Sequence, residues 1–484
     1  MNSKHARNAV ATPHTNRRVE SSRERPSFTE LYLWGASRSQ FLAVLRKAVS
    51  SVGSILTLAA LSVYQFGLYQ LILAALTIAD SFTGGLFDDI VANDLARGLA
   101  EGRLAWAKRL FHEFLLSKVA VGLIAFGVLL VSADFVARYY RADIAAYLRL
   151  VSVIIVLSEL RGAEMVFFQA RVSFSAFGVG VMQEALKVCV VAAFWAFGSL
   201  GLREVLLATV FASLGVLCYT SFFFLREYRS LFGVITAERH WVLPSIVREH
   251  GRWVFSRYAF SRAVKNTDVW FVRIFLNTEA VAFYALATNL ITSAQSLIPV
   301  AMLKVLLPWE VERKARFEYI YRRTVKYGIW IGTAMAVGGF IFVPSLIELF
   351  FPKYLPAMPV FRFMLLSLPL YGVYKLQKAF LIVLREQRML AFRVFTEATV
   401  MVLILGLFLP LIGLPAAAIA YLAAYGGRVV LYAIYLRRKY PGLKFKMRQL
   451  LMVDGADWQL ATQAIRIFFK PSRWMKPIRY AHGP

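Results

Sequence analysis

Motifs that would mark an enzyme are missing from this 484-residue sequence. It has no GxxxxGK[ST] loop, which excludes ATP hydrolysis by that route, and no HExxH motif or cysteine pair at zinc-ligand spacing. The two cysteines, Cys189 and Cys218, lie in apolar runs, where they fit as small packing residues and indicate no redox compartment. We therefore expect a protein that is not an enzyme, with no catalytic residue, no metal site and no cofactor.

Polar sequence is also scarce. The chain is 59% hydrophobic, against about 45–50% in soluble domains, and its mean hydropathy is +0.58. Apolar runs long enough to cross a hydrocarbon core of roughly 30 Å recur between positions 41 and 437. A large soluble protein with buried core helices would need more polar sequence between these runs. The composition predicts an all-α polytopic membrane protein.

Acidic residues number 28 against 56 lysines and arginines, which gives a net charge of +28. Such an excess can indicate nucleic-acid binding, but in a membrane protein lysine and arginine collect in the cytoplasmic loops, so no nucleic-acid partner is expected. The first residues, MNSKHARNAVATPHTNRRVESSRERP, have no apolar core. They predict a basic cytosolic tail rather than a cleavable signal peptide.

About twelve transmembrane helices are expected. Loops rich in cations, such as LARGLAEGRLAWAKR at 95–109 and VERKARFEYIYRR at 311–323, alternate with loops such as YQF at 64–66 and IGLP at 412–415, which have none. The positive-inside rule then places both termini in the cytosol. The expected helices cover residues 41–63, 66–92, 110–132, 144–168, 174–197, 204–226, 252–275, 279–307, 326–350, 358–384, 391–411 and 415–436.

The two halves of the chain repeat each other. FGLYQLILAAL at 66–76 matches VAFYALATNLI at 281–291, and VMQEALKVCVV at 181–191 matches VFTEATVMVLI at 394–404, which sets Glu184 against Glu397. A nearly constant offset predicts two six-helix bundles of the same membrane orientation. The expected parts are a basic cytosolic tail (1–40), an N-terminal bundle (41–227), a cytosolic linker (228–251), a C-terminal bundle (252–437) and a basic amphipathic cytosolic tail (438–484). That last tail fits a segment on the inner leaflet or a packed cytosolic helix.

Charged residues stand where the bilayer centre is expected. Glu184 is about ten residues into its helix, roughly 15 Å deep, and a central charge costs about 2.5–3.5 kcal/mol on insertion scales. Lys187 is one turn away and can neutralise it, and Arg393 is spaced to pair with Glu397. Two interpretations stay open: structural pairs that hold helices together, or pairs that border a wet, polar cavity.

Basic residues also fall in the first helix of each half. Arg46 and Lys47 lie in the first helix, and Arg257, Arg262 and Lys265 in the seventh. Arg46 and Arg257 are near enough to the cytosolic interface to snorkel, whereas Arg262 and Lys265 lie deeper and are better explained by a water-filled cavity. At the repeat offset, Arg262 matches Lys47. Cations in such a cavity suit a phosphate-bearing, anionic cargo.

Two aspartates are candidates for binding a coupling proton or cation. Asp80 lies midway along the second expected helix, where a helix-packing hydrogen bond is the alternative role. Asp268 follows Arg262 and Lys265 on roughly the same face of the seventh helix.

The runs YQFGLYQLILAALTIADSF, VANDLARGLAEGRLAWAKRL, NTDVWFVRIFLNTEAVAFYALATNLI and FFPKYLPAMPVFRFMLLSLPLYGV resemble Wzx-type polysaccharide flippases of the multidrug/oligosaccharidyl-lipid/polysaccharide (MOP) exporter superfamily. The resemblance spans about residues 40–437. It implies a V-shaped, MATE-like pair of bundles that works by alternating access. In that family, basic residues of the first and seventh helices face the cavity, which here corresponds to Lys47, Arg262 and Lys265. The chain departs from the family pattern before FGLY, where SVYQ stands in place of the usual arginine.

The function that this resemblance implies is export of undecaprenyl-pyrophosphate-linked oligosaccharide across a bacterial inner membrane, for exopolysaccharide or O-antigen biosynthesis. The expected partners are the lipid-linked glycan, membrane lipids, and a polysaccharide polymerase and glycosyltransferases. A cation-coupled multidrug exporter is an alternative, although its cargo is usually cationic. A non-transporting membrane scaffold for glycan enzymes is another.

Overall fold

The computed structural model describes residues 28–83, 87–139, 141–171, 178–198, 200–245, 247–248, 267–298, 314–384 and 386–440, and among these every regular element is a helix. Arg257, Arg262 and Lys265 lie outside the described residues, as do residues 1–27 and 441–484. Seven described helices are long and apolar enough to cross a membrane, and an eighth is added if one bent pair is a single span. The expected all-α polytopic membrane fold is confirmed.

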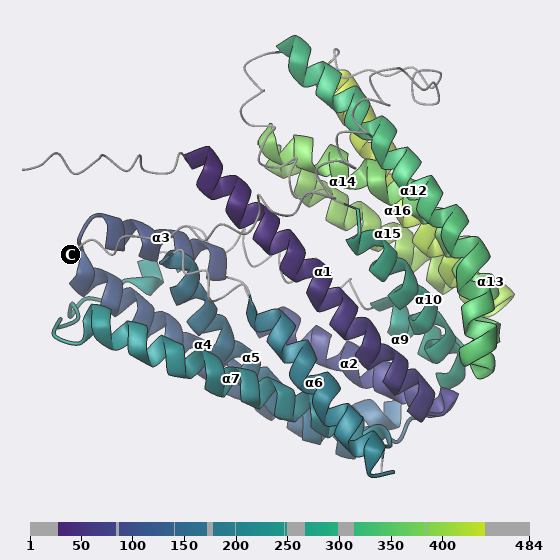
Figure 1. Cartoon of the computed structure of the whole chain (residues 1–484), viewed down its shortest axis with the longest axis horizontal. Coiled ribbons are helices and arrows are strands. Elements are labelled where there is room, and N and C mark those ends of the chain that lie inside the picture. Colours follow the sequence, from purple (N-terminus) through teal and green to yellow (C-terminus); the bar gives the residue numbers. More distant parts are fainter. Residues whose placement is uncertain are drawn as a thin grey trace, which may run out of the picture.

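The helices form two bundles that lie together near the C-terminal end of α1 and separate toward its N-terminal end (Figure 1). The N-terminal half contains α1 (Phe28–Ala60), α2 (Val63–Thr83), α3 (Asp88–Ala100), α4 (Leu104–Tyr139), α5 (Ala145–Ala170), α6 (Val179–Ala196) and α7 (Leu202–Phe232). The C-terminal half contains α9 (Thr267–Phe275), α10 (Thr278–Ser296), α12 (Lys314–Phe350), the 3₁₀ helix η3 (Pro352–Ala357), α13 (Met358–Leu365), α14 (Ser367–Val383), α15 (Gln387–Ile412) and α16 (Pro415–Lys439).

Packing is mainly within each half. In the N-terminal half α4 packs on α5, α5 on α7, and α6 on both α7 and α1, while in the C-terminal half α12 packs on α14 and α15 on α16. The halves meet chiefly where α2 packs on α10. Their backbones are so close there that a Cβ on Gly67 would lie 2.1 Å from the carbonyl oxygen of Thr278, so only glycine fits.

Several helix ends follow from local sequence. Gly413, with φ +67°, ends α15 in a conformation that favours glycine, and Pro415 begins α16 at a position where its missing N–H costs nothing. Asn277 caps α10 because its side chain accepts a hydrogen bond of 2.7 Å from the N–H of Ala280. These two tight connections fix α10 and α16 beside their neighbours.

The helix expected over 358–384 is broken. The two parts, Pro352–Leu365 and Ser367–Ile382, are bent by 46°. Pro369 explains the break, because it has no N–H for the carbonyl of residue 365 and its ring crowds that carbonyl. The Ser367 hydroxyl donates to the carbonyl of Met364 at 2.6 Å, which satisfies one freed carbonyl at the bend.

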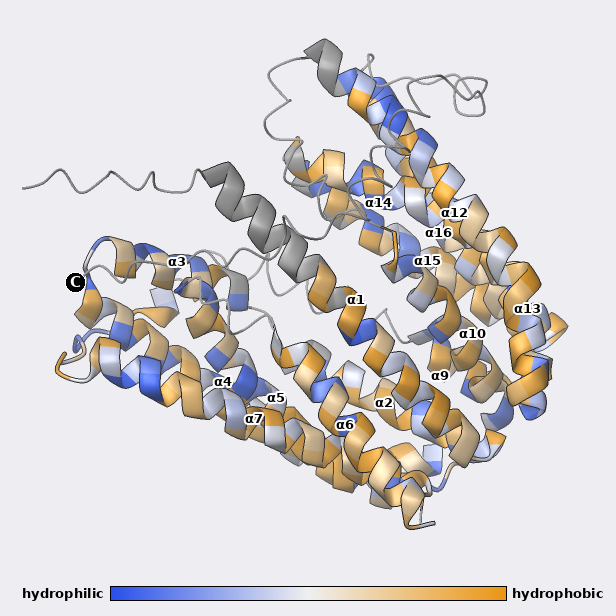
Figure 2. Cartoon of the chain, in the orientation of Figure 1, coloured by the Kyte–Doolittle hydropathy of each residue, from blue (hydrophilic) through white to orange (hydrophobic). Residues whose placement is uncertain are grey.

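Other helices are longer than expected. The first begins at Phe28 rather than near residue 41, and α4 has 36 residues, about 54 Å, which exceeds a core of roughly 30 Å. Hydrophilic residues gather in α3, at the end of α7 and at the beginning of α12, where the two bundles are separated (Figure 2). The long helices therefore extend beyond the apolar zone on that side.

The beginning of the linker is fastened to this extension. The carboxylate of Glu113 in α4 accepts hydrogen bonds from the backbone N–H groups of Val242 and Leu243 at 2.9 and 2.8 Å. The Lys108 ammonium donates to the carbonyls of Phe232 and Ile235 at 2.9 and 2.7 Å. Residues 233–243 thus belong structurally to the N-terminal half.

Candidate substrate-binding cavity

A cavity of about 540 Å³ lies between the two halves. Five helices line it: α1, α2 and α6 from the N-terminal half, and α10 and α12 from the C-terminal half. The polar lining residues are Lys47, Ser50, Ser51, Ser54, Thr57, Tyr69, Gln70, Glu184, Lys187, Asn289 and Ser293.

The charged wall is formed by α1 and α6. Lys47 enters it from α1, and Glu184 and Lys187 enter it from α6. Arg46, also on α1, reaches across α6 to place its Nη2 atom 3.8 Å from Oε1 of Glu184. The Arg46 side chain passes close to Gly180, where a Cβ would lie 3.2 Å from its Cδ atom. The pair thus crosses between two helices.

Lys187 has a different partner from the one expected on its own helix. Its ammonium donates to the Tyr69 hydroxyl of α2 at 2.9 Å, and Nζ lies 5.5 Å from the centre of the Tyr69 ring. The ion pair of Glu184 is with Arg46. Glu184 and Lys187 thus line the cavity, and their contacts to Arg46 and Tyr69 also join α6 to α1 and α2.

Hydroxyl groups continue this wall along α1. Ser51, Ser54 and Thr57 each donate to the carbonyl four residues earlier, at 2.8, 2.9 and 2.8 Å. Their donors are satisfied, while the hydroxyl oxygens keep lone pairs that can accept further hydrogen bonds. This row can therefore accept hydrogen bonds from a hydroxyl-rich ligand.

One part of the lining is apolar. It is formed by the end of α12, which contributes Val343, Leu346, Ile347, Phe350 and the adjoining Phe351. On α1 itself, Ile55 and Leu58 continue the apolar lining. The cavity lining therefore combines charge and hydroxyl groups, mainly from α1 and α6, with hydrocarbon, mainly from the end of α12, which matches a ligand of mixed character.

The cavity ends where the halves meet. The ammonium of Lys353 in η3 donates to the carbonyls of Leu61 and Ala59 at 2.6 and 3.3 Å, at the C-terminal end of α1. These carbonyls have no partner within the helix, and a cation at a helix C-terminus is favourable. Beside them the rings of Phe66 and Tyr354 make an edge contact with 5.7 Å between centres. These contacts, each between the two halves, close this end.

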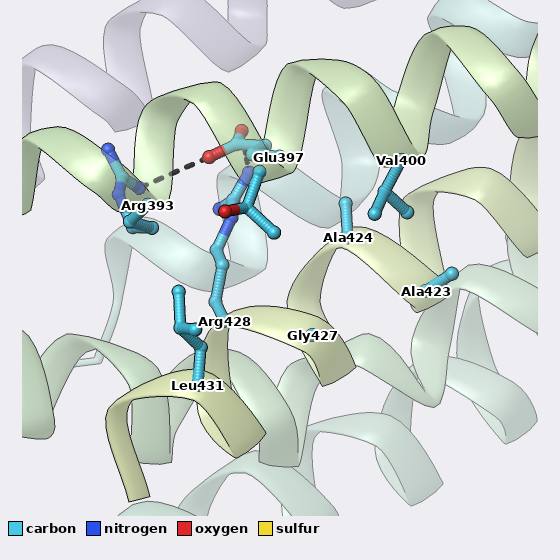
Figure 3. A pocket seen from close by; sticks show the side chains of 9 residues that line it. Arg393, Glu397, Val400, Ala423, Ala424, Gly427, Arg428 and Leu431 are labelled. Atoms are coloured by element: carbon cyan, nitrogen blue, oxygen red, sulfur yellow. Dashed lines mark hydrogen bonds and ion pairs between the residues drawn. The ribbon is translucent and has the colours of Figure 1, made fainter. Parts of the chain in front are cut away.

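The matched glutamate of the C-terminal half has other surroundings (Figure 3). Arg393 lies 3.3 Å from Oε2 of Glu397, as the sequence predicts, and Arg428 of α16 pairs with the other oxygen. Arg393 also donates to the Tyr374 hydroxyl at 2.5 Å, and the Arg428 guanidinium lies 4.3 Å from the centre of the Tyr425 ring. The space that Arg393, Glu397 and Arg428 line is about 10 Å³, room for about one water. The side chains themselves fill most of this space.

The aspartates lie elsewhere in the bundles. Asp268 is buried in α9 and accepts a hydrogen bond of 2.5 Å from the Tyr284 hydroxyl of α10. Asp80 lies near the end of α2, where its charge acts on Arg161 of α5. Neither is among the described residues that line the cavity. Within the part of the chain that the structure describes, no cluster of histidine, cysteine, aspartate or glutamate could hold a metal ion.

Sequence reasoning missed several residues of these sites. Arg428 has a signal in the sequence, because it is a lone charge in the run YGGRVVLYAIYL. Lys118 is another: it is buried in α4, 2.8 Å from Oδ1 of Asp88 and 2.9 Å from Oε2 of Glu159. Lys353 gave no signal, because its partners are backbone carbonyls.

Solved transporters of the MOP superfamily share this fold. An inward-facing multidrug resistance MATE family transporter has a TM-score of 0.62 and 14% identity, over 84% of this chain and 95% of that one. Lipid II flippase MurJ in an inward closed conformation has a TM-score of 0.65 and 12% identity, over 93% and 100%. A MOP superfamily transporter from Pyrococcus furiosus, titled for the reverse polarity of its binding pocket, has a TM-score of 0.60 and 14% identity, over 85% and 96%. At these identities the likeness establishes the MOP superfamily fold.

The sequence also matches a family described as polysaccharide biosynthesis protein, over residues 58–355. Because this match covers more than half of the chain, the chain belongs to that family. No curated protein matches the sequence. The resemblance to polysaccharide flippases of the MOP superfamily is confirmed at the level of family and fold.

Proposed function

We propose that this protein moves an undecaprenyl-pyrophosphate-linked oligosaccharide across a bacterial inner membrane by alternating access, as a step in exopolysaccharide or O-antigen biosynthesis. The observation that carries the proposal is the cavity between the halves, whose lining combines cations and hydroxyls with hydrocarbon. Membership of a polysaccharide biosynthesis family supports the glycan part of the cargo.

Each part of the lining suits one part of such a lipid. Lys47, Lys187 and the neighbouring Arg46 attract the pyrophosphate, since guanidinium and ammonium groups bind phosphate oxygens well. The α1 hydroxyls, with Gln70 and Asn289, offer hydrogen bonds to sugars. The apolar end of α12 lies beside the beginning of the prenyl chain, and the rest of that chain stays in the bilayer.

The described state is inward-facing in this proposal. Both termini are placed in the cytosol, so the end where the bundles separate faces the cytosol and the end at Lys353 faces outward. To release cargo outward, the halves rock, the contacts of Lys353 and Tyr354 with α1 and α2 break, and the cytosolic side closes. A proton or sodium gradient drives the cycle, and Asp268 and Asp80 are proposed to bind the coupling ion.

The residues outside the described ranges keep a proposed role. Arg262 and Lys265, with Arg257, belong to the first helix of the C-terminal half, and we propose that they add basic groups to the cavity. A polymerase and glycosyltransferases are proposed as neighbours in the same pathway, because they would consume and supply the lipid-linked glycan.

A sidedness assay in proteoliposomes tests this proposal. The full chain is reconstituted with labelled undecaprenyl-pyrophosphate-linked oligosaccharide in one leaflet, and the label reaching the other leaflet is measured with a membrane-impermeant glycosidase. We expect wild type to transfer label and Lys47→Ala plus Lys187→Ala to slow transfer at least about tenfold, because one lost charge-assisted contact is worth about 1.5–3 kcal/mol. Arg203→Ala, at an exposed position outside the cavity lining, is the matched control.

Two results would contradict the proposal. One is inserted, correctly folded wild type that transfers no label. The other is transfer of a cationic dye in preference to the glycan lipid, which would favour the multidrug exporter instead.

A further inference from the structure

Glu184 is the only acidic side chain among the described residues that line the cavity. We propose that Glu184 is a built-in counter-anion, which balances the charge of Arg46 and Lys47 while the cavity is empty and gives way to the anionic group of the cargo. This inference rests on the proposed function. It implies that Glu184 determines how tightly the cargo binds and how readily it is released.

The geometry of Glu184 is that of a replaceable partner. The separation of 3.8 Å from Arg46 exceeds the 2.7–2.9 Å that is typical of charge-assisted hydrogen bonds. The Arg46 side chain is 56% exposed, so its remaining donors are accessible to a ligand. Glu397, by contrast, is held at both oxygens by two arginines in a space with no room for a ligand.

Three cations on one wall need an anion when no cargo is present. Lys47 and Lys187 line the cavity from α1 and α6, Arg46 of α1 lies beside Glu184, and like charges gathered in this way repel one another. A carboxylate among them lowers this repulsion in the empty state. Once a phosphate group arrives, the same carboxylate repels it, which weakens binding and favours release.

Lys187 takes a different part in this exchange, because its ammonium donates to Tyr69 at 2.9 Å rather than to Glu184 and keeps further donors for the cargo. The exchange therefore concerns the α1 cations, which approach Glu184 from the opposite helix. A motion of α1 relative to α6 would change both the ion pair and the charge offered to the cargo, which links headgroup binding to helix position.

The test measures binding of farnesyl pyrophosphate and of farnesol to the purified full chain in detergent, by titration calorimetry. We expect Glu184→Gln to bind farnesyl pyrophosphate roughly three- to tenfold more tightly than wild type, the range that one unit charge produces in a hydrated site. Farnesol binding should stay unchanged. In proteoliposomes the same variant should show a lower KM together with a lower maximal rate.

Three variants separate charge from shape and folding. Glu348→Gln removes the same charge from an exposed position on α12 outside the cavity lining, and it should bind as wild type does. Glu184→Asp keeps the charge and should also resemble wild type, while Glu184→Ser provides a second neutral variant if the glutamine variant does not fold. Tighter binding by the aspartate variant would overturn the inference, because shape would then explain the effect.

A double-mutant cycle gives a second readout. Arg46→Gln should weaken farnesyl pyrophosphate binding more in the Glu184→Gln background than in wild type, because Arg46 is no longer partly neutralised. Equal effects in both backgrounds, or weaker binding by Glu184→Gln, would overturn the inference and leave the proposed function standing. If neither wild type nor any variant distinguishes farnesyl pyrophosphate from farnesol, the proposed function itself fails.

Discussion

Glu184 and Glu397 occupy matched positions in the two halves, and the same carboxylate has been given opposite surroundings. Glu184 lines a cavity of about 540 Å³ and faces one arginine at 3.8 Å. Glu397 lines a space of about 10 Å³ and is paired at both oxygens. The cations also come from different helices: α1 supplies Arg46, whereas α15 and α16 supply Arg393 and Arg428.

The matched tyrosines show the same divergence. Tyr69 accepts a hydrogen bond from Lys187, while Tyr284 donates one to Asp268. The repeated fold thus keeps the two tyrosines at matched backbone positions, while their side-chain hydrogen-bond partners differ between the halves. The difference teaches that, of the two matched glutamates, Glu184 offers its charge to a cavity, whereas the charge of Glu397 is neutralised by two arginines.

The largest effect is expected for the cluster of Arg393, Glu397 and Arg428. Glu397→Leu leaves Arg393 and Arg428 without a counter-charge in the bundle, which should cost about 3–5 kcal/mol of stability. Glu184→Leu should cost about 1 kcal/mol or less, since its arginine is half exposed. Thermal unfolding of both variants in detergent, followed by fluorescence-detected size exclusion, measures the difference. Equal losses would erase the distinction between the two halves.

The next effect concerns the basic groups outside the described residues. Arg262→Ala plus Lys265→Ala should reduce extracellular glycan at least about tenfold while protein levels hold, if the C-terminal half adds cations to the cavity. Glycan on the cell surface and protein in the membrane fraction are measured together. Normal export would confine the cargo's electrostatic recognition to the N-terminal half.

A smaller effect is expected at the closed end. Lys353→Met removes the ammonium from the carbonyls of Ala59 and Leu61, and the loss of about 1 kcal/mol should shift the population toward the outward-open state roughly fivefold. Spin labels at the exposed positions Tyr64 and Leu355, after replacement of both cysteines, report the distance distribution across this end. Lys353→Arg keeps the donors and should preserve the wild-type distribution. An unchanged distribution for the methionine variant would remove Lys353 from the closing contacts.

The smallest effect is expected at Glu386, which lies between α14 and α15. Hydrogen bonds from Lys439, and then from Tyr435 and Tyr440, lower the pKa of Glu386 to about 2 from its ordinary value of 4.5. A lowered folded-state pKa stabilises the protein above pH 4.5, and the contribution is lost as the pH falls toward 2. Glu386→Gln should therefore cost at most about 1 kcal/mol at pH 7, because partners near solvent are screened, and this deficit should shrink as the pH falls from 4.5 toward 2. A stability gap of the same size at pH 7 and pH 2 would rule out this origin.

Much of the fold could be predicted from the sequence because apolar runs and basic loops mark spans and sides directly. The break near Pro369 was not predicted, because the apolar run continues through it as one expected helix. The proline itself is the sequence feature that indicates the break. The charged residues at Lys47, Glu184 and Lys187 were found, but their partners were not. Spacing within one helix cannot show that Gly180 leaves room for Arg46, or that Tyr69 of another helix faces Lys187.

The close approach of Gly67 to Thr278 also determines how far a small motion carries. Helix α12 has 37 residues, about 55 Å, so tilting one half by 10° about this contact would displace the far end of such a helix by roughly 10 Å. The two halves would rotate about this contact, and the length of the helices converts a small rotation into a large displacement. A single added methyl group at residue 67 would push α2 and α10 apart at this contact, and the resulting displacement would be largest at the opposite face of the membrane.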